Sequence, residues 1–211
     1  MYAEPITNGL KLGSVLLSLV FFLDFFISYT EVSVTPKYLY RSGFFYNILN
    51  LLFITPLVYI MVYENFLNTK ENQFEFWKCI AIIVIQNIGY YFAHKCMHSK
   101  YLYHIHKFHH QYNQIVIPSA AFAVTVSEFV FAYLSPLFVA SFFLNPTMAT
   151  LSITSFFIGI CNLLIHTPQL FKVQWIPYIV SPHSHMKHHI VQKKHFAAPI
   201  IDIDKIISDY Q

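Results

Sequence analysis

Residues 119–166 read SAAFAVTVSEFVFAYLSPLFVASFFLNPTMATLSITSFFIGICNLLIH. Two apolar runs, 119–144 and 147–166, are separated by Asn145-Pro146, a pair that is typical of turns. Each run is long enough to cross the hydrocarbon core of a bilayer once, which takes about 20 residues. The stretch therefore predicts a transmembrane hairpin, which returns the chain to the membrane face from which it started.

Three further apolar runs precede the hairpin, at residues 12–29, 44–63 and 77–93. A signal peptide would also explain the first run. Few basic residues precede this run, the run is longer than the apolar region of a usual signal peptide, and no cleavage site follows. We therefore interpret it as a retained helix. Pro56 predicts a kink that neighbouring helices tolerate. Asp24 and Glu128 lie within apolar runs, and we expect both to face other helices because a lipid-facing carboxylate is costly.

The hairpin decides which segments share a membrane face. Residues 94–110 before it and 166–195 after it must lie on the same side, and most of the lysines lie there too. By the positive-inside rule this face is cytosolic. The sequence from about residue 170 onward is too polar to span, so we expect a short helical cap against the membrane face.

These patterns predict an all-α fold, a multispan integral membrane helical bundle with a histidine-rich cytosolic face. We expect a single membrane domain over residues 1–211, with N-terminal spans in 1–75 and the histidine-rich region in 76–211. No internal repeat or linker divides the chain.

Composition supports a membrane protein. Of the 211 residues, 56% are hydrophobic and 11% are charged, against about 25% charged in ordinary soluble domains. The mean hydropathy is +0.49. These values exclude a disordered chain, collagen and a nucleic-acid-binding tail, so we expect no nucleic-acid partner. The net charge of +3 is too small to indicate a partner, and three cysteines argue against a disulfide framework.

The histidines carry the strongest signal. All twelve lie between residues 94 and 195. His94 and His98 form an H-x-x-x-H pattern, one helical turn apart, and an H-x-x-H-H pattern occurs at 106–110 and again at 185–189. Repeated helical spacing on one membrane face is typical of metal ligands. The candidate ligands, which include the histidine that closes the fifth run, are His94, His98, His106, His109, His110, His166, His185, His188 and His189.

Nine imidazoles exceed the needs of one ion, because structural zinc takes four protein ligands and catalytic zinc three. We therefore expect two ions. Imidazole suits iron, copper, zinc and nickel, so the ligand type alone does not choose the metal. We expect Cys96 to point away from the histidine face. An iron–sulfur cluster and a heme with a thiolate ligand are therefore disfavoured, and a paired non-heme metal site remains.

Four polar residues lie outside this ligand set. We expect Asn162, His183 and His195 to contact ligand imidazoles and hold them in the right tautomer. His104 lies outside the repeated spacing, and we expect it to be a bystander.

The histidine patterns resemble those of the fatty acid hydroxylase and sterol desaturase superfamily of membrane di-iron enzymes. The likeness covers roughly residues 88–210 and includes Glu128 and the Ser181-Pro182 pair before the third pattern. His195 and Ile203 depart from the family pattern, which usually has Asn and Trp there. The sterol hydroxylase and methylsterol oxidase branch looks nearest, although an acyl or sphingoid chain would fit the same residues.

This resemblance implies an enzyme of the endoplasmic reticulum membrane that hydroxylates or desaturates a lipid C–H bond. Its cofactors would be two iron ions, with zinc as a substitute in purified protein, together with O₂. Cytochrome b5 and NAD(P)H would supply the electrons. Its partners would be the bilayer, a sterol or acyl lipid, and an acidic electron donor that docks on lysines of the histidine face.

Two alternatives stay open at this point. A membrane zinc or iron transporter would use histidines to gather the ion, but transporters usually place polar residues near the midplane in repeated halves. Only Asp24 and Glu128 qualify, and no repeat is visible. The departures at His195 and Ile203 also permit an inactive member of the same fold.

Overall fold

The computed structural model describes residues 3–68, 73–173 and 175–210. Over these residues the fold is helical, and five helices are long and apolar enough to cross a membrane. They are Ala3–Ile27, Lys37–Phe66, Phe76–Met97, Val126–Leu144 and Met148–Ile165. The chain is therefore a multi-pass membrane protein, and the predicted helical membrane bundle is confirmed.

The first two spans each combine α-helical and π-helical segments. The first consists of α1 (Ala3–Phe22) and a π-helical segment (Leu23–Ile27), and α2 (Tyr29–Val34) connects it to the second. The second consists of α3 (Lys37–Ile48), a π-helical segment (Leu49–Ile54) and α4 (Thr55–Phe66). Pro56 lies in the first turn of α4, directly after this π-helical segment, so the expected kink site is an irregularity of the helix.

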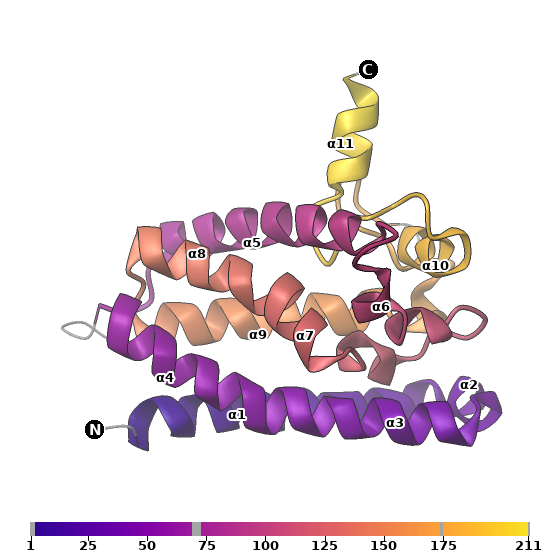
Figure 1. Ribbon diagram of the computed structural model, residues 1–211, viewed down its shortest axis with the longest axis horizontal. Helices are drawn as coiled ribbons and strands as arrows, with labels where there is room; N and C mark the ends of the chain where they lie inside the picture. The colour runs from indigo at the N-terminus through magenta and orange to yellow at the C-terminus, as the bar shows by residue number, and fades with distance from the viewer. Residues whose placement is uncertain (1–2, 69–72, 174, 211) are drawn as a thin grey trace.

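The remaining elements form the third span, the hairpin and the histidine-rich end. The third span is α5 (Phe76–Met97), and the hairpin consists of α7 (Val126–Glu128), a π-helical segment (Phe129–Leu134), α8 (Ser135–Leu144) and α9 (Met148–Ile165). The shorter helices are α6 (Tyr103–His106), α10 (Pro182–Val191) and α11 (Ile203–Asp209). Figure 1 shows the long helices side by side, with α6 and α10 at one end and α11 projecting away from the bundle.

The hairpin turn forms where the sequence predicts it. Asn145 ends α8 in the left-handed conformation, with φ of 44°, which asparagine tolerates better than most residues. The Thr147 side chain then caps α9 by accepting a hydrogen bond from the Thr150 amide. Because α8 and α9 run in opposite directions, α9 ends beside α6 and α10, and the segments before and after the hairpin meet.

One boundary differs from the prediction. The fourth span begins at Val126, whereas the apolar run predicts a start at residue 119. Residues 118–122 form a 3₁₀ turn, and the chain is then irregular until Thr125 caps α7. This segment is apolar because it is buried against other helices beneath the histidines, and apolarity alone does not distinguish a buried turn from a span.

Span side chains satisfy the polar backbone of this buried turn. Three side-chain amides donate to its carbonyl oxygens: Asn47 to Ser119 at 2.8 Å, Asn162 to Ala121 at 2.8 Å and Asn50 to Val124 at 2.9 Å. Asp24 accepts a hydrogen bond from the Ser119 amide at 3.0 Å. Irregular backbone at membrane depth is tolerated only where such partners exist. Asp24 and Glu128 are both fully buried, which confirms that they face the protein interior.

Candidate metal centre

The nine candidate ligands come together at one end of the bundle, in two adjacent groups. Within each group, the nitrogens that could bind an ion all lie within 4.8 Å of one another. The five-histidine group consists of His94, His98, His106, His110 and His188, and the four-histidine group consists of His109, His166, His185 and His189. They come from α5, α6 and the turn after it, the end of α9, and α10.

Helical geometry explains how each histidine pattern divides between the two groups. Histidines four residues apart stay together: His94 with His98, His106 with His110, and His185 with His189. The additional histidine of each H-x-x-H-H pattern joins the other group, so His109 lies in the four-histidine group and His188 in the five-histidine group. On an α-helix, residues i+3 and i+4 point about 100° apart, so one turn of α10 can serve two ions. The 106–110 pattern runs from the end of α6 into a 3₁₀ turn and divides in the same way.

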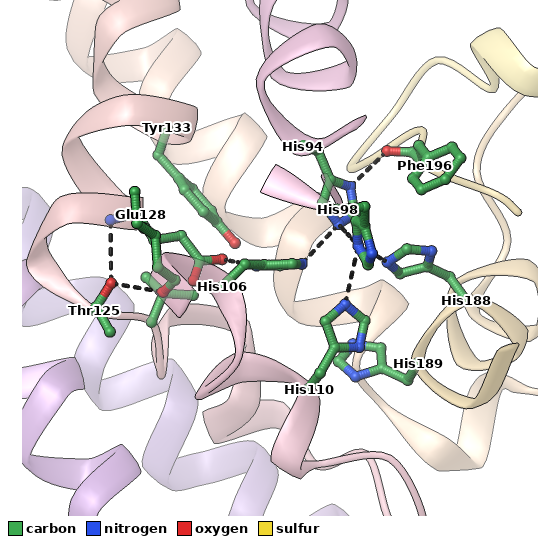
Figure 2. A network of polar contacts seen from close by, with 12 residues as sticks. His94, His98, His106, His110, Thr125, Glu128, Tyr133, His188, His189 and Phe196 are labelled. Carbon is green, nitrogen blue, oxygen red and sulfur yellow. Dashed lines mark hydrogen bonds and ion pairs between the residues drawn. The ribbon is translucent and has the colours of Figure 1, made fainter. Parts of the chain in front are cut away.

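Oxygen acceptors fix the orientation of four of the rings through their Nδ1 atoms. Three backbone carbonyls serve in this way: Phe196 for His94 at 2.7 Å, Lys194 for His188 at 2.8 Å and Asn162 for His166 at 2.7 Å. The fourth acceptor is the Glu128 carboxylate, whose Oε1 lies 2.5 Å from Nδ1 of His106 (Figure 2). A carbonyl oxygen can only accept, so Nδ1 carries the proton in those three rings and Nε2 keeps its lone pair.

The Nε2 atoms converge at separations that suit a shared ion. In the five-histidine group, Nε2 of His94 lies 2.9 Å from that of His106, and His98 lies 3.1 Å from His188. In the four-histidine group, the Nε2 atoms of His166 and His185 are 3.0 Å apart. Ligands about 2.1 Å from one ion would lie about 3.0–3.4 Å apart, so the geometry fits two imidazole-bound metal ions.

Burial keeps these imidazoles neutral at pH 7. Loss of solvation lowers the pKa of His98 to about 4, and it lowers that of His166 to about 4 against the opposing effect of the Asn162 carbonyl. Burial likewise lowers the pKa of His188 to about 3. An imidazole binds a metal only in its neutral form, so these rings do not have to lose a proton first.

A family comparison agrees with this geometry. The family model of the fatty acid hydroxylases matches residues 79–208, which include both histidine groups. The chain belongs to the fatty acid hydroxylase family. No curated protein and no solved structure matches this fatty acid hydroxylase chain. The predicted superfamily is confirmed, while the match does not distinguish the sterol branch from the others.

The other predicted residues of the fatty acid hydroxylase site take different places. Asn162 contacts His166 through its backbone carbonyl, while its side chain supports the buried turn. His183 is exposed, and His195 is half-buried with φ of 60°. Three of the four ring-orienting contacts come from backbone carbonyls, two of them next to His195, and the fourth comes from the Glu128 side chain. A backbone carbonyl leaves no mark in a sequence, so no pattern could have revealed those three. His104 is exposed and contacts the Tyr101 carbonyl, apart from both groups.

An apolar cavity lies inside the bundle below the histidines. Its volume is about 70 Å³, and Leu16, Phe122, Tyr133 and Asn162 are among the residues that line it. Asn162 lines the cavity, and its backbone carbonyl also orients His166, so this residue lies between the cavity and the four-histidine group. An engineered cavity of about 150 Å³ holds one benzene, so this one has room for only a few methylene groups.

Proposed function

We propose that this chain oxidises a lipid C–H bond, as a hydroxylase or desaturase, at two non-heme iron ions held by the nine histidines. The observation that carries the proposal is the convergence of these imidazoles into two adjacent groups, in a member of the fatty acid hydroxylase family. Zinc would occupy the same donor set in purified protein. Membership of this family favours an enzyme over a transporter.

The chemistry explains why a metal centre is needed. A bound pair of redox-active ions supplies the activation of O₂ that cleavage of an aliphatic C–H bond requires and that side chains cannot provide. Hydroxylation consumes one O₂, two electrons and two protons for each alcohol and water formed. Desaturation uses the same reactants and releases two waters. An external electron donor is therefore part of the proposal.

The chain's own residues perform positioning and shielding. The carbonyls of Asn162, Lys194 and Phe196 hold three rings with Nε2 turned inward. The buried turn at residues 118–124 lies below the histidines and excludes water from that side. A dry, preorganised site of this kind protects a reactive centre from side reactions.

The proposed substrate is a sterol, or an acyl or sphingoid chain. The cavity of about 70 Å³ is too small for either whole molecule. We propose that most of the lipid lies against the outer surface of the spans, where many large apolar side chains are exposed. Substrate from the bilayer can reach such a site without crossing water.

We place the chain in the endoplasmic reticulum membrane with the histidine groups on the cytosolic side. Exposed lysines near the groups suit an acidic electron donor of the cytochrome b5 type, fed by NAD(P)H. Lys194 is one of them, and its own carbonyl contacts His188. We also infer that residues 1–211 form one domain, with the division at residue 75 marking the end of the N-terminal spans.

Metal analysis combined with lipid analysis tests this function. We expect purified protein to contain about two iron ions per chain, and cells that lack the protein to accumulate one lipid and lose its oxidised product. A bound metal with an unchanged lipid profile would indicate an inactive member. Ion flux through reconstituted vesicles, with no lipid oxidation, would indicate a transporter.

A further inference from the structure

Glu128 contacts the metal centre without belonging to either histidine group. It lies at the end of α7, is fully buried, and places Oε1 2.5 Å from Nδ1 of His106. Figure 2 shows His106 between this carboxylate and His94, with its two ring nitrogens facing in opposite directions. The carboxylate holds Nδ1 of His106 and therefore turns Nε2 toward the other rings of the five-histidine group.

Thr125 fixes the position of Glu128 relative to His106. The Thr125 hydroxyl accepts a hydrogen bond from the Glu128 amide at 3.2 Å and donates one to the Ile105 carbonyl at 3.0 Å. Two parallel contacts thus join residues 105–106 to the start of the fourth span. The carboxylate is held in place by backbone structure and does not depend on the metal for its position.

The two histidine groups differ in these supporting contacts. The five-histidine group has three oriented rings, and one of their acceptors is a carboxylate. The four-histidine group has one oriented ring, held by the neutral Asn162 carbonyl. Within residues 3–68, 73–173 and 175–210, Glu128 is the only carboxylate that contacts a ring of either group. Among these residues, Nδ1 has no partner in three rings of the four-histidine group, His109, His185 and His189, and in one ring of the five-histidine group, His110.

The charge of Glu128 lacks other compensation. Its second oxygen, Oε2, is buried and has no hydrogen-bond partner in the described part of the chain. A buried carboxylate with one contact is costly unless a positive charge lies nearby. An ion bound to Nε2 of His106 would supply that charge through the ring. A carboxylate behind a ligand imidazole fixes its tautomer and raises its basicity.

We propose that Glu128 is a positioning residue that makes the two metal positions unequal, so that the five-histidine group holds its ion more tightly than the four-histidine group does. Glu128 acts through His106 and touches neither ion. The inference rests on the proposed metal centre, but it concerns the order of metal affinities and not the lipid that is oxidised.

The test measures cobalt(II) binding, by visible absorption and by competition with a chelator. We expect wild-type protein to bind two ions with different affinities. Glu128→Gln keeps an oxygen that can accept from His106 but removes the charge. The substitution should weaken the affinity for one cobalt ion by about 10- to 100-fold and leave the affinity for the other unchanged. Asp24→Asn is the matched control, because Asp24 is also fully buried but accepts its hydrogen bond from the Ser119 amide and not from a histidine, and an asparagine oxygen can still accept there.

Histidine variants identify the position that is affected. In a His185→Ala chain, which lacks a full four-histidine group, Glu128→Gln should weaken the affinity for the remaining ion by the same factor. In a His98→Ala chain, Glu128→Gln should not change the affinity for the ion that the four-histidine group retains. The melting temperature of the metal-free Glu128→Gln protein should equal or exceed that of the wild type, which separates a metal effect from misfolding.

The inference would be overturned if Glu128→Gln weakened the affinity for both ions equally, weakened only the affinity of the four-histidine group, or changed neither affinity. If wild-type protein binds two ions and oxidises no lipid, the proposed function fails while this inference can still hold. If wild-type protein does not bind two ions, both fail.

Discussion

At the scale of single residues, the centre depends on which nitrogen of each imidazole carries the proton. Carbonyl acceptors hold Nδ1–H in His94, His166 and His188, so the Nε2 lone pair of each ring faces Nε2 of a neighbouring histidine. These neighbours are His106, His185 and His98 respectively. Lone pairs at 2.9–3.3 Å repel unless a proton or a cation lies between them. Such an arrangement is costly to the fold, and a bound ion relieves the cost.

Histidines inside and outside the groups should respond differently to substitution. We expect His109→Ala to abolish lipid oxidation and to lower the metal content, because it removes a fully buried ring of the four-histidine group. His104→Ala is the control, because this ring is exposed and contacts only the Tyr101 carbonyl. Product formation and metal content per chain check both variants. Full activity in His109→Ala would refute the assigned ligand set.

The metal-free protein should become less stable as the pH is lowered. The unfolded chain gains protons on its histidines near pH 6.5, whereas burial keeps the pKa of His98 and His166 at about 4 in the fold. Between these values the unfolded state binds more protons, so stability is lost as the pH falls from about 6.5 toward 4. Melting temperatures at pH 7.5 and 5.5 measure this loss. His166→Gln should show a shallower dependence, and a flat profile in the wild type would contradict the argument.

At the scale of elements, the site depends on the buried turn between α6 and α7. Asn47, Asn50 and Asn162, from three different helical segments, donate to the Ser119, Val124 and Ala121 carbonyls of this turn. Asp24 lies within the π-helical segment of the first span and Asn50 within that of the second, while Glu128 directly precedes the third. A π-helical segment changes the direction in which a side chain leaves the helix, and such segments often occur at functional sites.

Removal of one of these donors should destabilise the bundle. Asn50→Leu leaves the carbonyls of Phe122 and Val124 without the amide that now contacts both. We expect a loss of about 1–3 kcal/mol, the usual cost of a buried polar group without a partner. Asn65→Leu is the control, because Asn65 is exposed and bonds the Met61 carbonyl of its own helix. Unfolding in detergent measures both variants, and equal stabilities would contradict the role of Asn50.

At the scale of the whole molecule, the hairpin brings distant parts of the chain to one membrane face. The histidines of α5 and α6 precede it, those of α9 and α10 end or follow it, and each group draws on both sides. Neither group is complete until the hairpin has packed. We therefore expect metal binding to depend on the complete bundle and not on any single helix.

Topology can be measured by labelling cysteines from either side of the membrane. In a chain without its native cysteines, Lys107→Cys and Lys187→Cys should react with an impermeant reagent from the cytosolic side only, because both positions are exposed at the histidine end. Glu64→Cys, at the opposite end of α4, should react from the lumenal side only. Reaction of either lysine position from the lumen would show that the proposed orientation is wrong.

The sequence by itself determined the number of spans, the hairpin and the set of nine histidines that meet. Span number follows from local hydropathy and bilayer thickness, and the shared face follows from counting spans, so neither needs long-range packing. The tertiary structure alone decided how the nine divide into groups of five and four, which carbonyls orient the rings, and that residues 118–124 are a buried turn. Those features depend on ring rotation and on backbone atoms of distant segments. Both are set by side-chain packing between helices, which leaves no periodic signal in the sequence.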